Sequence, residues 1–193
     1  MFQTKSEITR RDVVFLFTSF LVFSFVLVSQ ETVSAKKVES KYFKRLYQIN
    51  DSVYRSDQPN RKGFRELEAK GINSVINFRR NVRDDKRARD TKLHLEHFPL
   101  KTSELSEEQI VSALKLVQAA EKPVLIHCWH GSDRTGAIAA AYRIVFEGWE
   151  KEKAIAELRR DEFGYHENWY PNVVDLLKNL NVGEIRNVLG IKQ

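Results

Sequence analysis

The chain has 193 residues, of which 42% are hydrophobic, 11% aromatic and 30% charged. That content of large apolar side chains excludes a disordered or low-complexity protein and fits one globular domain. The single cysteine, Cys128, excludes an intramolecular disulfide framework and a cysteine-rich zinc site. A net charge of +6 suits anionic partners. The basic residues are scattered and carry no nucleic-acid-binding motif, so the sequence predicts a basic surface without a nucleic-acid partner.

Residues 1–35 differ in composition from everything after them. Three basic residues precede an apolar run over 13–28, and small residues precede Ala35. This order is typical of a secretory signal peptide cleaved after Ala35. The alternative is an uncleaved N-terminal membrane anchor, for which the 16 residues of the run are slightly short against about 30 Å of hydrocarbon. The sequence predicts this leader or anchor, a single domain over 36–193, and an extracytoplasmic location, with membrane association through 13–28 if the segment is uncleaved.

The first part of the domain alternates short apolar runs with helical patterns. Asn60 and Gly71 are typical start and exit residues of a helix, and Ser106–Gln109 is a capping box that opens another helix. The elements predicted before that box are strands over 46–49, 53–55, 73–78 and 93–98 and a helix over 60–70. Residues 79–90 carry six basic and three acidic side chains and are predicted to be a solvent-exposed charge run.

The second part of the domain begins with a compact apolar strand over 123–127. A glycine- and polar-rich loop follows, and an alanine-rich helix then runs to Glu147. Further helices are predicted over 151–163, 172–180 and 184–189. Because strands and helices alternate through the middle of the chain, the predicted fold class is α/β, with a mainly parallel sheet covered by helices on both faces.

The segment from His127 to Gly136 carries the chemistry and reads H-C-W-H-G-S-D-R-T-G. A loop of this length between a buried strand and a helix can direct successive backbone N–H groups at one phosphate. The N-terminal end of the following helix adds positive potential at the same point. The predicted phosphate-binding loop consists of Trp129, His130, Gly131, Ser132, Asp133 and Arg134, in which Gly131 lets the backbone turn.

Cys128 and Arg134 are six residues apart, as a thiolate phosphatase requires. The planar guanidinium of Arg134 can hold two phosphate oxygens, and the loop and helix favour thiolate over thiol at Cys128. Attack on phosphorus would form a phosphocysteine that water hydrolyses, with the Thr135 hydroxyl donating to the departing sulfur. No metal or other cofactor is predicted: His94 and His97, three apart on a predicted strand, face opposite sides and make a poor metal pair.

The chain resembles the cysteine-dependent dual-specificity and protein-tyrosine phosphatases, in particular the exported, periplasmic members from bacteria. The resemblance covers roughly 42–164 and includes Tyr54-Arg55-Ser56, Gln58-Pro59-Asn60, the loop 127–136, Ala141-Tyr142-Arg143-Ile144-Val145 and Gly148-Trp149. It implies the phosphatase fold, a periplasmic location and metal-free dephosphorylation of phosphotyrosine and of phosphoserine or phosphothreonine. Cys128 and Arg134 fall on the family's nucleophile and phosphate-binding arginine.

Two histidines and two tryptophans receive less specific assignments. His127 resembles the family's buried histidine that orders the loop, and its expected role is supporting. His130, inside the loop, faces either substrate or solvent. Trp129 and Trp169 are interpreted as wall and core side chains rather than as specific recognition groups.

The general acid is where the chain departs from its relatives. The relatives place an aspartate on the loop that corresponds to 99–105, and Ser103 stands at that position. Two carboxyl groups remain as catalytic candidates. Asp133 resembles in its position an acid of the myotubularin-like phosphatases, and its alternative role is a structural acceptor for loop amides. Glu104 lies one residue beyond Ser103, and its alternative role is a charge at the start of a helix. A reaction without a dedicated acid is the third possibility.

The predicted function is a phosphatase that acts on a phosphorylated protein or a small phosphomonoester. A phosphoinositide or inositol phosphate is the alternative substrate. The loop contains Asp133 and no lysine, which disfavours polyanionic substrates, whereas the basic run 79–89 would favour them if it lay near the pocket. A catalytically inactive phosphate-binding module is the second alternative, although such modules usually lack the cysteine or the arginine.

Overall fold

The computed structural model describes residues 34–192. The apolar run over 13–28 lies outside it. No helix in the described part has both the length and the apolar character needed to cross a membrane.

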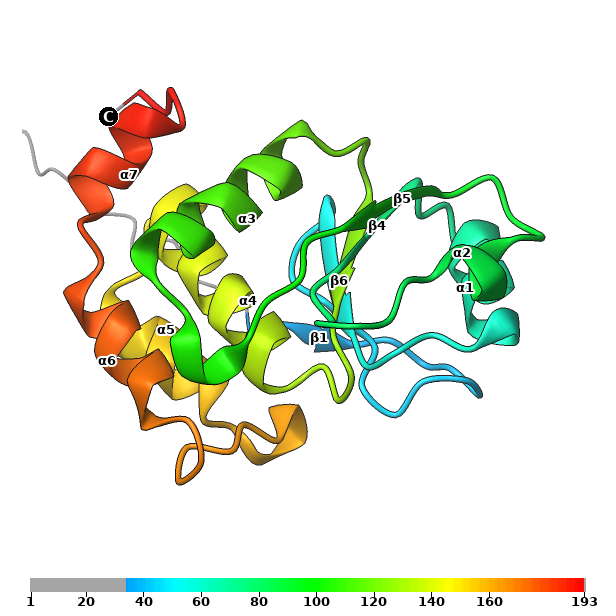
Figure 1. The fold of residues 1–193 in the computed structure, drawn as a ribbon, viewed down its shortest axis with the longest axis horizontal. Coiled ribbons are helices and arrows are strands. Elements are labelled where there is room, and N and C mark those ends of the chain that lie inside the picture. Colours follow the sequence, from blue (N-terminus) through cyan, green and yellow to red (C-terminus); the bar gives the residue numbers. More distant parts are fainter. Residues whose placement is uncertain (1–33, 193) are drawn as a thin grey trace, which may run out of the picture. The chain divides into compact units, whose positions relative to one another are not determined.

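Six strands form one mixed sheet in the order β1-β2-β3-β6-β4-β5 (Figure 1). Their bounds are β1 Lys36–Lys37, β2 Tyr47–Gln48, β3 Val53–Ser56, β4 Ser74–Asn77, β5 His94–His97 and β6 Val124–His127. The pairings β3–β6, β6–β4 and β4–β5 are parallel, whereas β1–β2 and β2–β3 are antiparallel. The α/β class with a mainly parallel sheet is confirmed, and β1 is an edge strand that the sequence analysis missed.

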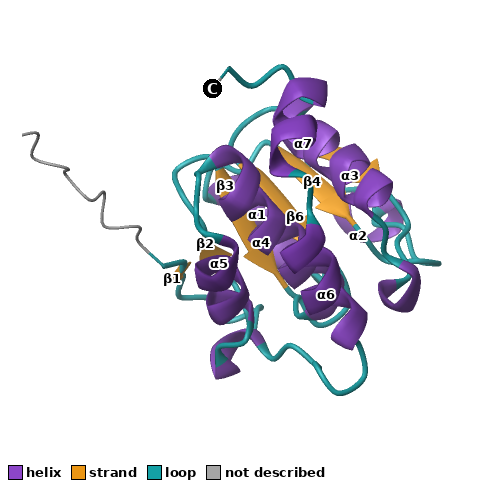
Figure 2. Cartoon of the chain, turned by 90° about the vertical axis from the view of Figure 1, so that its left-hand side faces the viewer, coloured by secondary structure: helices purple, strands orange, loops and turns teal. Residues whose placement is uncertain are grey.

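Helices cover both faces of the sheet, as predicted. They are α1 Arg61–Ala69, α2 Asp85–Ala88, α3 Glu107–Ala119, α4 Asp133–Phe146, α5 Lys151–Leu158, α6 Pro171–Asn179 and α7 Val182–Val188, with short 3₁₀ turns η1 Thr102–Glu104 and η2 Asp161–Phe163. Along β6, Leu125 packs in the core beneath α1 and α2, while Val124 and Ile126 pack beneath α3 to α7. Figure 2 views the sheet from the side of this larger group of helices.

Local signals set the helix ends that the sequence analysis predicted. The side chain of Asn60 accepts a hydrogen bond of 2.9 Å from the amide of Gly63, and Gly71 follows α1 with a φ of +80°. Both hydrogen bonds of the capping box at Ser106–Gln109 are present before α3. These caps satisfy backbone groups that a helix end leaves without partners.

The single helix predicted over 151–163 is wrong, because α5 ends at Leu158 and η2 follows as a separate turn. The break lets Phe163 reach the core, where it is fully buried. Its ring lies 4.9 Å from the Tyr47 ring and 4.3 Å from the Arg55 guanidinium carbon. A continued helix would have followed its own axis instead of returning Phe163 to β2 and β3.

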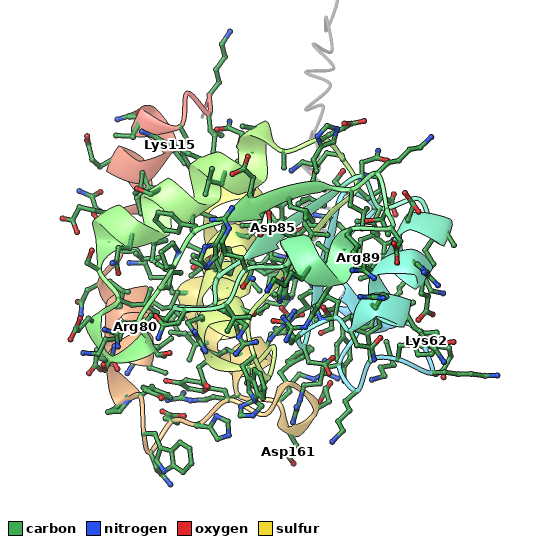
Figure 3. The ribbon with its side chains drawn as sticks, turned by 45° about the vertical axis from the view of Figure 1, so that its right-hand side comes forward. Lys62, Arg80, Asp85, Arg89, Lys115 and Asp161 are labelled. Carbon is green, nitrogen blue, oxygen red and sulfur yellow. The ribbon has the colours of Figure 1, made fainter. Side chains whose placement is uncertain are left out.

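The prediction that the whole charge run 79–90 is exposed is also wrong. Arg80, Asp85 and Arg89 lie at the surface (Figure 3), but Asp84 is only 4% exposed. Burying a carboxylate is unfavourable unless it is paired and hydrogen-bonded. Asp84 meets that condition, because the side chains of His127 and Gln58 both contact it at 2.8 Å.

Candidate active site

The predicted phosphate-binding loop joins the end of β6 to the beginning of α4. Cys128 is the first residue after β6 and is 2% exposed. α4 begins at Asp133 and has 14 residues, so its N-terminal end brings a full helix dipole to the loop. The sequence motif therefore forms a strand–loop–helix unit with the sulfur at its base.

Gly131 makes the turn of the loop possible for two reasons. Its φ is +73°, in the left-handed region that favours glycine. A Cβ atom at this position would lie 2.5 Å from the carbonyl oxygen of Ser56, far inside van der Waals contact. The loop thus packs directly against the backbone that follows β3.

Three consecutive carbonyl groups of the loop are held by residues on or near β2 and β3. The amide of Gln58 donates to the Trp129 carbonyl at 3.0 Å, Arg45 to the His130 carbonyl at 3.5 Å and Arg55 to the Gly131 carbonyl at 2.8 Å. Arg55 is buried, and its burial lowers its pKa to about 10. Within the described residues, none of the amide groups of residues 129–134 has a protein acceptor. Consecutive backbone amides without acceptors, directly before a helix, are typical of an anion-binding loop.

Two buried side-chain groups at the loop also lack partners. Among the described residues, Arg134 Nε and Thr135 Oγ1 are the buried side-chain nitrogen and oxygen atoms without a hydrogen bond. Arg134 is held at one end, where Nη1 donates to the Phe78 carbonyl at 3.4 Å. An unsatisfied buried polar group costs about 1–3 kcal/mol, so both positions favour a ligand that supplies acceptors.

His127 and Asp84 form a buried pair directly behind Cys128. His127 is fully buried, with Nδ1 3.0 Å from the Cys128 carbonyl oxygen and Nε2 2.8 Å from Asp84 Oδ2. Burial raises the pKa of Asp84, but hydrogen bonds from His127 and Gln58 outweigh this and lower it. The ring is therefore held between the Cys128 carbonyl oxygen and the Asp84 carboxylate. This buried contact fixes the backbone at Cys128, where the phosphate-binding loop begins.

A cavity of about 310 Å³ opens at the loop. Its lining includes Arg79 and Arg80 after β4, Trp129 and Arg134 of the loop, and His166 and Trp169 before α6. Trp129 and Trp169 are 49% and 72% exposed and line the cavity, so the wall part of their interpretation agrees with the structure and the core part is wrong. The guanidinium carbon of Arg79 lies 4.1 Å from the centre of the Trp129 ring, which fixes this wall by a cation–π contact.

The two carboxyl groups proposed as acids occupy different environments. Asp133 lines the cavity, but its carboxylate accepts hydrogen bonds from the backbone amide and the Nδ1 of His166. Glu104 is exposed, pairs with Lys101 and does not line the cavity. His130 lines the cavity, and burial and the charge of His166 lower its pKa.

A family model decides the classification. The model described as "Polymorphic toxin system, DSP-PTPase phosphatase" matches residues 50–148, which include β3, β6 and the whole loop. The chain belongs to this phosphatase family.

Individual relatives agree with that membership. The dual specificity protein phosphatase TpbA of Pseudomonas aeruginosa strain UCBPP-PA14 is 37% identical over 123 residues, covering 62% of this chain and 55% of TpbA. The chain thus spans about half the length of the curated TpbA proteins it matches. A crystal structure of a TpbA Cys-to-Ser variant in complex with phosphotyrosine has 27% identity and a TM-score of 0.74, covering 85% of this chain and 100% of that one.

A more distant structure supports the fold alone. The core catalytic domain of the Saccharomyces cerevisiae PP-IP phosphatase Siw14, solved with citrate, has 20% identity and a TM-score of 0.64. The match covers 75% of this chain and 90% of that one. The family model and the TpbA proteins confirm the resemblance inferred from the motifs at the level of the dual-specificity phosphatase family.

In this phosphatase-family chain, the structure brings most of the predicted site residues together. Trp129, His130, Asp133 and Arg134 line one cavity, and His127 and Thr135 are buried at the two ends of the loop. Glu104 is not brought there. Sequence reasoning missed Asp84 and His166, since each lies in a segment without a motif; only the expected burial of His127 signalled that some acceptor had to face it.

Proposed function

We propose that the chain is a cysteine-dependent phosphatase that hydrolyses phosphotyrosine, and phosphoserine and phosphothreonine as well. The observation that carries the proposal is the loop between β6 and α4, where amides without acceptors and the unpaired Arg134 Nε follow Cys128 within six residues. This arrangement supplies both a phosphate site and a nucleophile.

The chemistry follows from the charges at the loop. The Cys128 thiolate attacks phosphorus, the bond to the leaving oxygen breaks, and a phosphocysteine forms. Loop amides and Arg134 stabilise the charge on the phosphoryl oxygens in the transition state. Water then attacks phosphorus and the sulfur departs as a thiolate, to which the buried Thr135 hydroxyl can donate because it lacks another partner.

An aromatic substrate fits the walls of the cavity. Trp129 and Trp169 expose flat apolar faces at its opening, and such faces stabilise a phenyl ring by offset or edge-to-face contact. The phosphotyrosine complex of TpbA gives independent support for this substrate class. Phosphotyrosine is therefore the substrate that we expect the protein to prefer.

One observation favours a polyanionic alternative, a phosphoinositide or inositol phosphate. Arg79 and Arg80 of the charge run line the cavity with Arg134 and could meet additional phosphate groups. Comparing kcat/KM for phosphotyrosine peptides with that for phosphoinositides distinguishes the two. A higher value for the phosphoinositides would reverse the order of substrates.

The test of the enzyme itself is the hydrolysis of p-nitrophenyl phosphate by the purified protein and its Cys128→Ser variant. The wild type should release phosphate, while Cys128→Ser should be inactive because a serine hydroxyl does not form the required anion at neutral pH. Vanadate should still bind the variant through the loop and Arg134. An inactive wild type that binds vanadate would indicate a phosphate-binding module instead.

We also propose that the protein acts outside the cytoplasm. The basic start, apolar run and small residues within 1–35 support this location. Expression of the full chain in a Gram-negative host, followed by fractionation and determination of the N-terminal residue, tests it. Lys36 at the N-terminus of a periplasmic product supports cleavage, an intact N-terminus in the membrane supports an anchor, and an intact cytoplasmic product contradicts the proposal.

A further inference from the structure

His166 and Asp133 form a hydrogen-bonded pair at the wall of the cavity. The backbone amide of His166 donates to Asp133 Oδ1 at 2.9 Å, and its ring Nδ1 lies 3.0 Å from Oδ1 and 3.1 Å from Oδ2. Asp133 opens α4 directly before Arg134, whereas His166 lies on the segment between η2 and α6. The pair therefore ties this segment to the phosphate loop.

This geometry does not suit Asp133 as the acid. Both of its oxygens face N–H groups of His166, and its side chain is only 13% exposed. Because both oxygens are engaged by His166, neither is directed at a leaving group in the cavity. Asp133 is instead placed to orient the ring, since its contact with Nδ1 fixes which nitrogen carries that hydrogen.

The other ring nitrogen of His166 is available. Within the described residues, Nε2 has no hydrogen-bond partner, and the side chain is 35% exposed. The ring stacks on Trp169 with a centroid distance of 5.0 Å and an interplanar angle of 12°, so its plane is restrained. His166 and Arg134 line the same cavity. An oriented imidazole with one unoccupied nitrogen beside a phosphate site is the arrangement of a general acid and base.

We propose that His166 is the catalytic acid and base of this phosphatase, and that Asp133 is its positioning residue. The proposal rests on the proposed function. As the thiolate of Cys128 attacks phosphorus, the P–O bond breaks and the leaving oxygen takes the proton from Nε2, which releases an alcohol or phenol. Neutral Nε2 then takes a proton from the water that attacks phosphorus. The P–S bond breaks, phosphate departs, and both the thiolate and the imidazolium are restored.

Several charged or titratable groups contact His166 or line the same cavity. The negative charge of Asp133 favours the imidazolium form. Positive charge in the same cavity opposes that form, and the groups that can supply it are Arg134 on α4, His130 in the loop, Arg79 and Arg80. On the segment of His166 itself, Glu167 is paired with Arg159. Because the acid must be protonated when the first step occurs, the rate with a poor leaving group should fall on the alkaline side.

The experiment compares two leaving groups in the full chain and its His166→Asn variant. Asparagine keeps an amide that can donate to Asp133 but has no transferable proton. Turnover of a phosphoserine peptide should fall by about 10²-fold or more and lose its alkaline limb, since a positioned acid contributes about 10²–10⁴-fold. With p-nitrophenyl phosphate, whose leaving group needs no proton, the initial burst of nitrophenolate should stay within about threefold of wild type. His94→Asn, an exposed histidine paired with Glu121 on the β5 side, is the matched control and should match wild type on both substrates.

Two further variants separate catalysis from folding. In His166→Ala, added imidazole should restore turnover of the phosphoserine peptide, which a merely structural defect would not allow. Asp133→Asn should move the alkaline limb to lower pH, because the imidazolium loses the adjacent negative charge. The acid role is refuted if His166→Asn keeps the wild-type rate and pH profile on the peptide. It is also refuted if His166→Asn loses activity equally on both substrates and imidazole does not restore the activity of His166→Ala. If the wild type releases phosphate from neither substrate, the proposed function fails and the acid role fails with it.

Discussion

Replacing Gly131 by alanine tests how closely the phosphate loop must approach the backbone after β3. The alanine would hold a φ of +73°, and left-handed backbone costs an L-residue about 1–2 kcal/mol. Its Cβ would also lie 2.5 Å from the Ser56 carbonyl oxygen, so the loop must retreat by about 0.9 Å to reach an ordinary contact of 3.4 Å. A misplacement of about 1 Å at a reacting centre can lower a rate about 10²-fold. We therefore expect Gly131→Ala to lose about 10²-fold in kcat/KM on p-nitrophenyl phosphate.

Gly71→Ala is the matched control for this experiment. Gly71 has a φ of +80°, but an added Cβ would meet nothing within 4 Å. Urea unfolding should show a loss of about 1–2 kcal/mol for Gly71→Ala, with unchanged kinetics. Wild-type kcat/KM in Gly131→Ala would refute the argument, and so would an equal loss of activity in Gly71→Ala.

Three further predictions concern the groups around the loop. Arg134→Lys should lower kcat/KM by about 10²-fold or more, because the ammonium cannot reproduce the planar fork. Asp84→Asn should destabilise the protein by about 1–3 kcal/mol at pH 7 in urea unfolding, because it removes the carboxylate that contacts the buried His127 ring at 2.8 Å. The folded-state pKa of Asp84 is lowered. Its contribution to the free energy of unfolding is therefore complete above its unfolded pKa of about 4 and is lost as the pH falls through the lower folded value. The Asp84→Asn variant should lack this loss of stability in acid. Trp129→Ala should reduce kcat/KM for a phosphotyrosine peptide relative to a phosphoserine peptide by roughly fivefold, equivalent to about 1 kcal/mol of aromatic contact.

Each of these predictions has a contradicting outcome. Unchanged kinetics in Arg134→Lys would show that Arg134 does not hold phosphate. The control is Arg89→Lys, at an exposed arginine that pairs with Asp90. A stability curve for Asp84→Asn parallel to that of wild type below pH 4 would show that Asp84 is not the titrating group. An equal loss on both peptides in Trp129→Ala would exclude a ring-specific wall.

Local sequence was sufficient to predict the loop and several helix ends. The residues that form the phosphate site are contiguous from 128 to 134, so their spacing alone predicted the strand–loop–helix unit. The same holds for the cap at Asn60 and the capping box before α3, where donor and acceptor are three residues apart. Such short-range geometry depends little on the rest of the fold.

Pairs that are distant in sequence could not be predicted. Asp84 and His127 are 43 residues apart, and Asp133 and His166 are 33 apart. Asp84 sits among six basic residues of the charge run, a composition that predicts exposure unless the facing histidine is known. β1 contains only two exposed lysines, which carry no alternation of apolar and polar residues. In each case tertiary contacts outweighed the local pattern.

The attachment of the loop to β2 and β3 also determines when the site forms during folding. Arg55 and Gly131 are 76 residues apart, and Arg45 and His130 are 85 apart. Contacts that join such distant residues form late, because the entropy of closing the intervening chain must be overcome first. On refolding, the helices can form from local signals while the loop carbonyls still lack their donors. Catalytic activity should therefore return with the slowest phase of refolding, after most of the far-ultraviolet circular dichroism has recovered.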